Sequence, residues 1–465
     1  MKIYQRILLA GVAGFAAVST ASAADLGGIK KPAVAEYVRV CNAYGAGFFF
    51  IPGTDTCLKI GGRVRAEYYY LESKDRNGAG ASGSGFREQG RLLLDARTNS
   101  EWGVVRAFTR IDIAKRTGTS RSGSQIRQGN AFENAGSTSI DTAGKVETFI
   151  NIDAAFVQFA GFTAGRLTSF YDFEGTSLSW FGVNGSKLGP TNLVAYTATF
   201  GAGFSATVSV EDNLEARNRV FTPTSPFNPA GNAINYGNQA LPDIVGALRV
   251  DQAWGSAQLS GALHQLYYSN TSLTGTGAAA PAITTGSLGA GSHPSSDYGF
   301  AVQGGVKINL PFIKPGDALY LQGSYVKGAL SYIIGGGCGQ DSPAQCSFTD
   351  NTNVPTYDAY ATRTAAGGFN TKLTTAYNGV VGFTHYWTPT IRSNLNGSYT
   401  RFDYGKSTGL SDGNLYFAAF NTIWSPIKDL DIGAEVFYFN LHSSIASTIK
   451  NDDQWQFRMR IQRDF

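Results

Sequence analysis

The chain has 465 residues, of which 57 are glycine, 13% are aromatic and 15% are charged, and its mean hydropathy is −0.13. Lys and Arg number 38 against 34 Asp and Glu, and loss of a leader that carries Lys2 and Arg6 would leave 36 against 34. This near balance of charge argues against a nucleic-acid-binding protein.

Residues 1–23 have the pattern of a secretory signal peptide. Residues 1–6 carry the bases Lys2 and Arg6, and residues 7–18 are an apolar run of twelve. The Ala-Ser-Ala of residues 21–23 provides the small side chains that a signal peptidase needs. A helix that spans a bilayer needs about twenty apolar residues, and no later segment comes closer to that length. The mature chain is therefore predicted to be exported and to contain no transmembrane helix.

Residues 24–57 are predicted to form a lead-in segment before the first long strand. Pro52-Gly53 marks a turn between two apolar runs, and Cys41 and Cys57 flank this turn closely enough to be bridged. Cys338 and Cys346 lie in a glycine-rich loop and are predicted to form a second disulfide, because the cysteine count is even and an exported chain lies where disulfides persist. Metal binding by the cysteines is not expected, because none of the four histidines is near in sequence.

From Leu58 onward polar and apolar residues alternate, which is the pattern of β-strands whose two faces meet different surroundings. Alternation alone does not separate a soluble sandwich from a membrane sheet. In the last strand the apolar set is Trp455, Phe457, Met459 and Ile461, and the polar set is Gln456, Arg458, Arg460 and Gln462. Sixteen strands are predicted, beginning near Leu58, Gly90, Trp102, Val146, Phe162, Leu193, Phe204, Asp243, Ser256, Tyr298, Ala318, Thr375, Thr390, Asn414, Leu430 and Gln454.

The predicted connections alternate in length without exception. Odd strands are followed by longer loops rich in Gly, Ser and Asn, such as 73–85, 115–145, 271–297 and 335–374, and even strands by tight turns, such as 160–161, 201–203, 254–255 and 387–389. This regularity is typical of an up-and-down barrel and not of a Greek-key sandwich. Four tryptophans lie beside short turns, which is consistent with one rim at headgroup depth: Trp102, Trp254, Trp387 and Trp424. We therefore predict an all-β fold, a 16-stranded antiparallel up-and-down transmembrane β-barrel over residues 58–465.

Several stretches carry a resemblance to a known family. The segment Tyr37-Val-Arg-Val-Cys41, residues 51–62, residues 159–166 and the terminal Phe465 together resemble the alphaproteobacterial outer-membrane porins. The resemblance covers the ends and early strands closely and the long loops hardly at all. It implies a homotrimeric diffusion channel in the outer membrane, surrounded by lipid and lipopolysaccharide, with a C-terminal aromatic residue that serves assembly by the barrel-assembly machinery.

The polar faces of the first three predicted strands are unusually basic. A charged side chain on the lipid face would cost roughly 2–4 kcal/mol near the midplane, so these side chains are predicted to point into the lumen. Neighbouring strands are about 4.8 Å apart, so the side chains form one pore basic wall whose excess of bases favours anions. The wall consists of Lys59, Arg63, Arg65, Arg91, Arg97, Arg106 and Arg110, with Glu67, Asp95 and Asp112 interspersed.

The loop after the fifth predicted strand, residues 169–187, is the third long loop, which in sixteen-stranded porins folds inward and narrows the channel. Its aromatic residues are Phe170, Tyr171, Phe173, Trp180 and Phe181. In an exposed loop these side chains would leave their apolar surface in water, whereas packing against the inner wall buries that surface. Asp172 and Glu174 are predicted to face the basic wall across the constriction, where opposed charges and pore width set selectivity.

The sequence contains no motif that points to catalysis or to a cofactor. Residues 78–83 match the glycine spacing of a dinucleotide-binding loop, but no helix follows them, and no nucleophile motif accompanies any histidine. The sequence thus predicts a porin that passes small hydrophilic solutes and ions by passive diffusion, and not an enzyme. Two alternatives stay open: a substrate-selective channel of the same fold, which an aromatic constriction loop favours, and a surface adhesin or structural barrel.

Overall fold

The computed structural model describes residues 39–72, 84–117, 147–173, 178–183, 185–187, 190–213, 219–221, 233–234, 239–269, 271–274, 282–285, 293–334, 345–347, 353–355, 357–363, 369–403, 412–443 and 452–465. The predicted signal peptide, the loop carboxylate Glu174 and Cys338 of the second predicted bridge lie outside these residues. In the part of the chain that the structure describes, no helix is both long and apolar enough to cross a bilayer.

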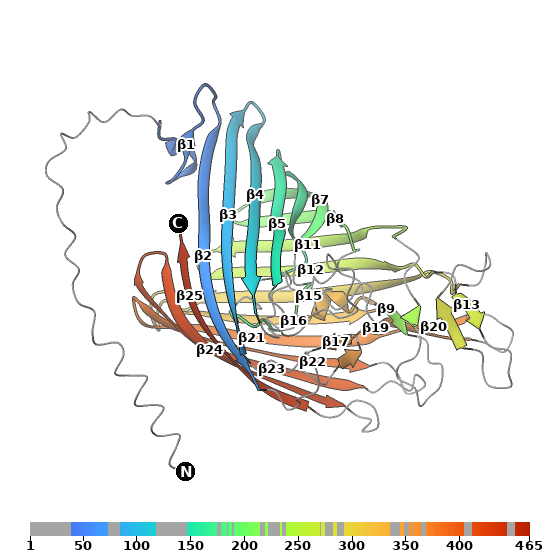
Figure 1. Cartoon of the computed structure of the whole chain (residues 1–465). Helices are drawn as coiled ribbons and strands as arrows, with labels where there is room; N and C mark the ends of the chain where they lie inside the picture. The colour runs from blue at the N-terminus through green and yellow to red at the C-terminus, as the bar shows by residue number, and fades with distance from the viewer. Residues whose placement is uncertain are drawn as a thin grey trace, which may run out of the picture. The chain divides into compact units, whose positions relative to one another are not determined.

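Sixteen of the described strands form one closed antiparallel sheet, in which each strand pairs with the next along the chain (Figure 1). The first and last of them also pair, from Arg63 opposite Asp464 to Leu71 opposite Gln456, and this seam closes the barrel. The strands are β2 (Cys57–Leu71), β3 (Ser84–Ser100), β4 (Gly103–Arg116), β5 (Glu147–Phe159), β6 (Phe162–Thr168), β7 (Pro190–Gly201), β8 (Phe204–Glu211), β11 (Asp243–Gln252), β12 (Gly255–Leu266), β15 (Asp297–Asn309), β16 (Ala318–Lys327), β21 (Thr375–Thr388), β22 (Ile391–Asp403), β23 (Gly413–Ile427), β24 (Leu430–Ser443) and β25 (Asp452–Asp464).

The predicted barrel and its strand count are confirmed. The largest difference in a strand start is at β3, which begins at Ser84 and not near Gly90. The stretch from Ser84 to Gln89 contains glycine and serine and reads as loop, but its residues already pair with β2, and exposed Phe86 alternates there with buried Arg87. Pairing to a neighbouring strand therefore outweighs the local turn composition.

The barrel turns apolar side chains outward and polar side chains inward, as alternation along each strand requires. On β25, Trp455, Met459 and Ile461 are each about half exposed, at 51%, 52% and 54%, whereas the intervening Arg458 is 1% exposed. With lipid on the outside, the outward set lies in hydrocarbon and the inward set lines the lumen. The four tryptophans beside short turns are all exposed.

The short turns occur on the predicted side, but one of them is not tight. Residues 310–317 join β15 to β16 with eight residues, only one fewer than the loop 404–412 on the long side. The connection closes on itself, because the Leu310 N–H donates to the Asp317 carbonyl at 2.8 Å and the Asp317 N–H to the Lys314 carbonyl at 3.1 Å. The prediction that the two lengths alternate without exception is therefore wrong here.

The long loops carry short elements that the sequence analysis did not predict. A four-stranded sheet joins segments of two loops that are far apart in the sequence, and two further hairpins are formed within loops. A single-turn helix, α3 (Ser331–Ile334), is buried at every position. The short strands are β9 (Arg219–Phe221), β10 (Ala233–Ile234), β13 (Thr271–Thr274), β14 (Ala282–Thr285), β17 (Gln345–Ser347), β18 (Asn353–Pro355), β19 (Tyr357–Arg363) and β20 (Phe369–Leu373).

The lead-in segment before β2 is held by the predicted Cys41–Cys57 disulfide, which the structure contains. The two cysteines are buried with Phe48 beside the short strand β1 (Phe49–Phe50), which pairs with the start of β2. The Arg97 guanidinium lies 5.0 Å from the centre of the Phe48 ring, so the segment packs against the lumen side of β3.

Replacing Cys41 and Cys57 together by Ser is expected to loosen the lead-in segment and leave the barrel folded. A disulfide that closes a loop of about 15 residues contributes about 3 kcal/mol, and here it acts only on a segment that precedes the closed sheet. Limited proteolysis should therefore cut between residues 41 and 56 in the variant, whereas the heat-dependent gel mobility of the folded barrel should not change. A Cys338→Ser and Cys346→Ser control should leave the lead-in resistant to the protease. Loss of the folded barrel in the first variant would contradict this expectation.

Candidate pore and constriction

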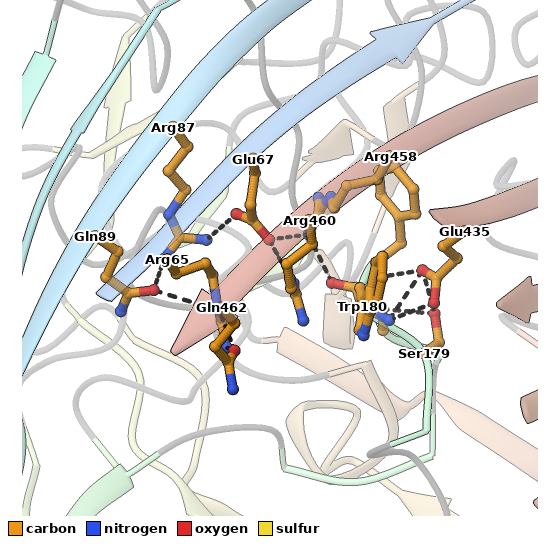
Figure 2. Close-up of polar contacts among 12 residues, drawn as sticks. Arg65, Glu67, Arg87, Gln89, Ser179, Trp180, Glu435, Arg458, Arg460 and Gln462 are labelled. Atoms are coloured by element: carbon orange, nitrogen blue, oxygen red, sulfur yellow. Dashed lines mark hydrogen bonds and ion pairs between the residues drawn. The ribbon is translucent and has the colours of Figure 1, made fainter. Parts of the chain in front are cut away.

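The loop between β6 and β7 extends inward, and its tip is attached to Glu435 of β24 (Figure 2). The Glu435 carboxylate accepts hydrogen bonds from the Ser179 hydroxyl at 3.1 Å and from the backbone N–H groups of Trp180 at 2.7 Å and Phe181 at 2.9 Å. The Asn421 side chain of β23 donates to the same carboxylate at 2.8 Å. The predicted inward folding of this loop is thus confirmed, and a single buried carboxylate anchors its tip.

Two arginines of β25 hold the same tip. Arg458 donates to the Trp180 carbonyl at 2.9 Å, and its guanidinium lies 4.0 Å from the centre of the Phe181 ring. The Arg460 guanidinium lies 4.3 Å from the centre of the Trp180 ring. Cations over aromatic faces attract the ring, and the attraction is largest where water is excluded. The aromatic residues of the loop tip therefore cover the guanidinium groups of the wall.

The returning part of the loop is fixed at Gly185. Its N–H donates to the Ile333 carbonyl of α3 at 2.7 Å, and its carbonyl accepts from Gln303 of β15 at 2.9 Å and also from Gln322 of β16. The backbone φ of Gly185 is +143°, and a Cβ at this position would lie 2.5 Å from a methyl group of Val380. Only glycine allows this approach of the loop to the wall.

The first part of the loop packs against β12, and this places Asp172 away from the position predicted for it. The Tyr171 carbonyl accepts from the Ser260 hydroxyl at 2.7 Å and from the Gln258 amide at 3.2 Å. The Asp172 carboxylate accepts the backbone N–H of Lys187 at 2.6 Å, within its own loop. The sequence analysis placed this carboxylate opposite the basic wall. In the structure the carboxylate instead joins the two ends of the loop, because Asp172 lies near its start and Lys187 near its end.

A buried ionic network fastens the loop and α3 to the wall. The Lys187 ammonium lies 3.0 Å from a Glu211 carboxylate oxygen, the His264 Nδ1 lies 2.8 Å from Asp243 Oδ1, and the Tyr332 hydroxyl donates to Asp243 Oδ2 at 2.6 Å. Burial, followed by the negative charge of Asp243, raises the pKa of the Tyr332 hydroxyl well above its usual value. This shift favours the protonated hydroxyl, which is the form that donates to Asp243.

An apolar cluster packs the loop and α3 against the inner wall of the barrel. It includes inward-facing side chains of the last strands. A simple alternation of faces would predict a polar inner wall throughout, and the wall is apolar here. Because the barrel-strand residues of this cluster come from β11, β12, β15, β16 and β21–β24, we infer that an open passage runs past the polar wall of β2–β5. Its large members are Tyr171, Phe181, Val183, Leu330, Tyr332, Ile333, Phe402, Leu415, Phe417, Phe437, Phe439 and Leu441.

The predicted basic wall lies on the lumen face, and carboxylates accompany most of its bases. Arg65 differs, because among the described residues it donates to the amide oxygens of Gln462 at 2.7 Å and Gln89 at 3.3 Å and to no carboxylate. The Lys59 side chain lies beside Gly47 of the lead-in segment. The other pairs are Arg63 with Asp464, Arg91 with Asp112 and Asp153, Arg97 and Arg106 with Asp95, and Arg110 with Asp153.

Glu67 is the centre of a group of arginines that sequence reasoning did not assemble (Figure 2). Its carboxylate lies 2.5 Å from Arg460, 3.3 Å from Arg87 and 3.6 Å from Arg458. The Glu67 side chain is only 1% exposed. The signal for this group was present, because Arg458 and Arg460 alternate on the polar face of the last strand. The wall was predicted only from the first three strands, and the seam that places β25 beside β2 was not used.

Comparisons with known proteins agree with this architecture. Residues 28–460 match the model of a family described as the porin subfamily. Porin Omp2a of Brucella ovis is 32% identical over 256 residues, which is 54% of this chain and 67% of that protein. Porin Omp2b of Brucella abortus (strain 2308) is 32% identical over 255 residues, which is 54% of this chain and 63% of that protein.

A solved structure shows the same fold. The outer membrane channel DcaP of Acinetobacter baumannii superposes with a TM-score of 0.58 at 17% sequence identity, covering 90% of this chain and 99% of that chain. The sequence matches to the Brucella porins therefore span about two thirds of those relatives, whereas the likeness in fold extends around the whole barrel. On the family match and the closed sixteen-stranded sheet, this chain belongs to the porin subfamily and is a β-barrel of the Gram-negative outer membrane.

Proposed function

We propose that this porin is a water-filled channel through which small hydrophilic solutes and ions cross the outer membrane by passive diffusion. The observation that carries the proposal is the loop tip of residues 179–181 on Glu435, which narrows a closed barrel from within. A loop held across the lumen by a buried carboxylate is suited to set the size of a passage, and an enzyme or an adhesin has no need of it. We propose no catalytic activity and no cofactor.

Uptake into liposomes tests this function. Liposomes that carry the purified protein should swell in solutions of small neutral sugars, at rates that fall as the sugar grows, because the constriction excludes larger solutes. A surface adhesin or structural barrel would leave the liposomes closed to all of them. Absence of swelling with correctly folded protein would contradict the proposal.

We also propose the assembly that the family resemblance implies. The barrel would form a homotrimer in contact with lipid and lipopolysaccharide, after insertion by the barrel-assembly machinery. The terminal Phe465 supports an assembly role through its position, since it exchanges backbone hydrogen bonds with Gly62 at 2.9 and 3.1 Å and so completes the seam. Chemical cross-linking in membranes, followed by gel electrophoresis, tests the trimer.

Replacing Arg63, Arg91 and Arg106 together by Ser is expected to shift ion selectivity toward cations. The substitutions remove three bases and leave their carboxylate partners in the lumen, and charged side chains that line a pore set its selectivity. The reversal potential in a planar bilayer with a KCl gradient measures the shift. A matched control is the pair Arg63→Ser and Asp464→Ser, which removes one base and one acid that lie 2.5 Å apart and should leave the reversal potential unchanged. An unchanged reversal potential in the triple variant would remove the proposed role of the basic wall.

A further inference from the structure

A cavity of about 450 Å³ lies beside the constriction loop, lined by Leu178 and Trp180 of the loop and by residues of the strands around it. It is an internal space of the lumen, separate from the apolar cluster described above. Five of its lining residues are basic and one is acidic. The bases are Arg63, Arg65, Lys307, Arg392 and Arg460, and the acid is Asp431.

The carboxylates that accompany these bases stand mostly in the wall behind the cavity. Arg392 pairs with Asp431 at 2.7 Å on the cavity surface, whereas Asp464 and Glu67, the partners of Arg63 and Arg460, are not among the lining residues. The cavity surface therefore presents more positive than negative charge, in a space where the protein around it weakens screening by water.

Arg65 is the base whose guanidinium is least neutralised. Its guanidinium donates to the amide oxygens of Gln462, at 2.7 and 2.9 Å, and of Gln89, at 3.3 Å. Glu67, the nearby carboxylate on the same strand, is engaged by Arg87, Arg458 and Arg460. An amide oxygen orients a guanidinium without cancelling its charge, so Arg65 keeps its positive charge available to an anion in the cavity.

The bases reach the cavity from different parts of the barrel wall. Arg65 and Arg460 come from β2 and β25 at the seam. Lys307 comes from β15, which is seven strands from β2 and six from β25 around the sheet. The Lys307 ammonium lies 5.3 Å from the centre of the Tyr320 ring, which also lines the cavity. A solute with a negative group at each end can therefore meet a base at both ends.

The size of the cavity limits the class of solute. A volume of about 450 Å³ lies within the range of about 300–1,000 Å³ that is typical of small-molecule sites, and it exceeds what a chloride ion needs. Guanidinium groups recognise carboxylates and phosphates through paired hydrogen bonds. We propose that this cavity is a binding site for small organic dianions, so that the channel passes these solutes through a saturable site; the inference rests on the channel function proposed above.

Single-channel recording with dianions added to KCl tests the site. Succinate and glycerol phosphate serve as the dicarboxylate and phosphate-ester probes, butyrate as the monoanion and succinamide as the neutral analogue. We expect the two dianions to reduce the KCl current in a saturable manner at concentrations about tenfold lower than butyrate, a ratio equal to 1.4 kcal/mol, and succinamide to have no effect. If only one dianion acts, the site is specific for that anionic group.

The variants locate the site. Arg65→Gln should raise the half-blocking concentration of the dianions about tenfold, and Lys307→Gln, at the opposite side of the cavity, should act in the same direction if the first variant fails to fold. Arg463→Gln is the matched control, because it removes one charge from the exposed, outward face of the same strand as Arg460. Equal shifts in Arg463→Gln and Arg65→Gln would overturn the assignment to the cavity.

Two results separate this inference from the function on which it rests. A protein that conducts KCl and is blocked no better by dianions than by butyrate retains the channel function and overturns the dianion site. A folded, inserted protein that conducts no KCl overturns the channel function itself.

Discussion

Replacing Glu435 by Gln is expected to release the tip of the constriction loop and to raise the single-channel conductance. The carboxylate accepts from one hydroxyl and two backbone N–H groups of the loop, and a hydrogen bond to a charged group contributes about 1.5–3 kcal/mol. The neutral Gln amide weakens each of these hydrogen bonds, and its NH₂ group would face N–H groups that are themselves donors. A loss of about 3 kcal/mol would shift the balance between seated and released loop by roughly a hundredfold. Larger conductance steps and faster liposome uptake of the larger sugars are the expected results.

Glu101→Gln is the matched control for the loop anchor. Glu101 is exposed at a short turn and accepts a hydrogen bond from the Trp102 indole at 2.9 Å, remote from the loop in sequence and in the sheet. Its replacement should leave the conductance unchanged. If the folded Glu435→Gln protein conducts as the wild type does, the tip does not control the passage and the constriction must be sought elsewhere in the lumen.

Replacing Glu67 by Gln is expected to destabilise the barrel and to shift its ion selectivity toward anions. The substitution leaves Arg87, Arg458 and Arg460 without the carboxylate that they share, and breaking a buried ion pair by removal of one partner costs about 3–5 kcal/mol. The temperature at which the folded gel band converts to the unfolded band measures the first effect. The reversal potential of the surviving channels measures the second.

Glu88 offers a control of the same residue type close by. It pairs with Ala66 on the neighbouring strand but is exposed on the outer face of β3. Glu88→Gln removes an equal charge and should change neither the conversion temperature nor the reversal potential appreciably. A Glu67→Gln barrel as heat-resistant as the wild type would show that the arginine group is stabilised by water and not by its shared carboxylate.

The strands could be predicted from sequence because each depends on local alternation. In β25 every second side chain faces the lumen, and this period appears directly in the run from Trp455 to Gln462. The strand number follows from counting such runs between turns. The start of β3 and the turn 310–317 were missed, because pairing at Ser84 and the internal hydrogen bonds of Leu310 do not depend on composition alone.

The constriction site was harder to predict from the sequence than the strands, because its contacts join residues that are far apart in the chain. Glu435 lies 255 residues from Trp180, and no local pattern marks it as the partner of the loop. Asp172 was predicted to face the basic wall from its charge. Its position is instead set by the Lys187 N–H, which donates to its carboxylate, and by the Gln258 side-chain amide, which donates to its carbonyl. The basic wall itself remains a prediction about selectivity, now extended by Arg458 and Arg460 across the seam.

The most direct test of this account is single-channel recording of the purified wild-type protein in a planar bilayer with equal KCl on both sides. We expect discrete, repeated current steps that grow in proportion to voltage, because the proposed water-filled passage runs through the closed sheet of β2–β25 beside the anchored loop. A bilayer that contains the folded protein and shows no current steps would contradict it.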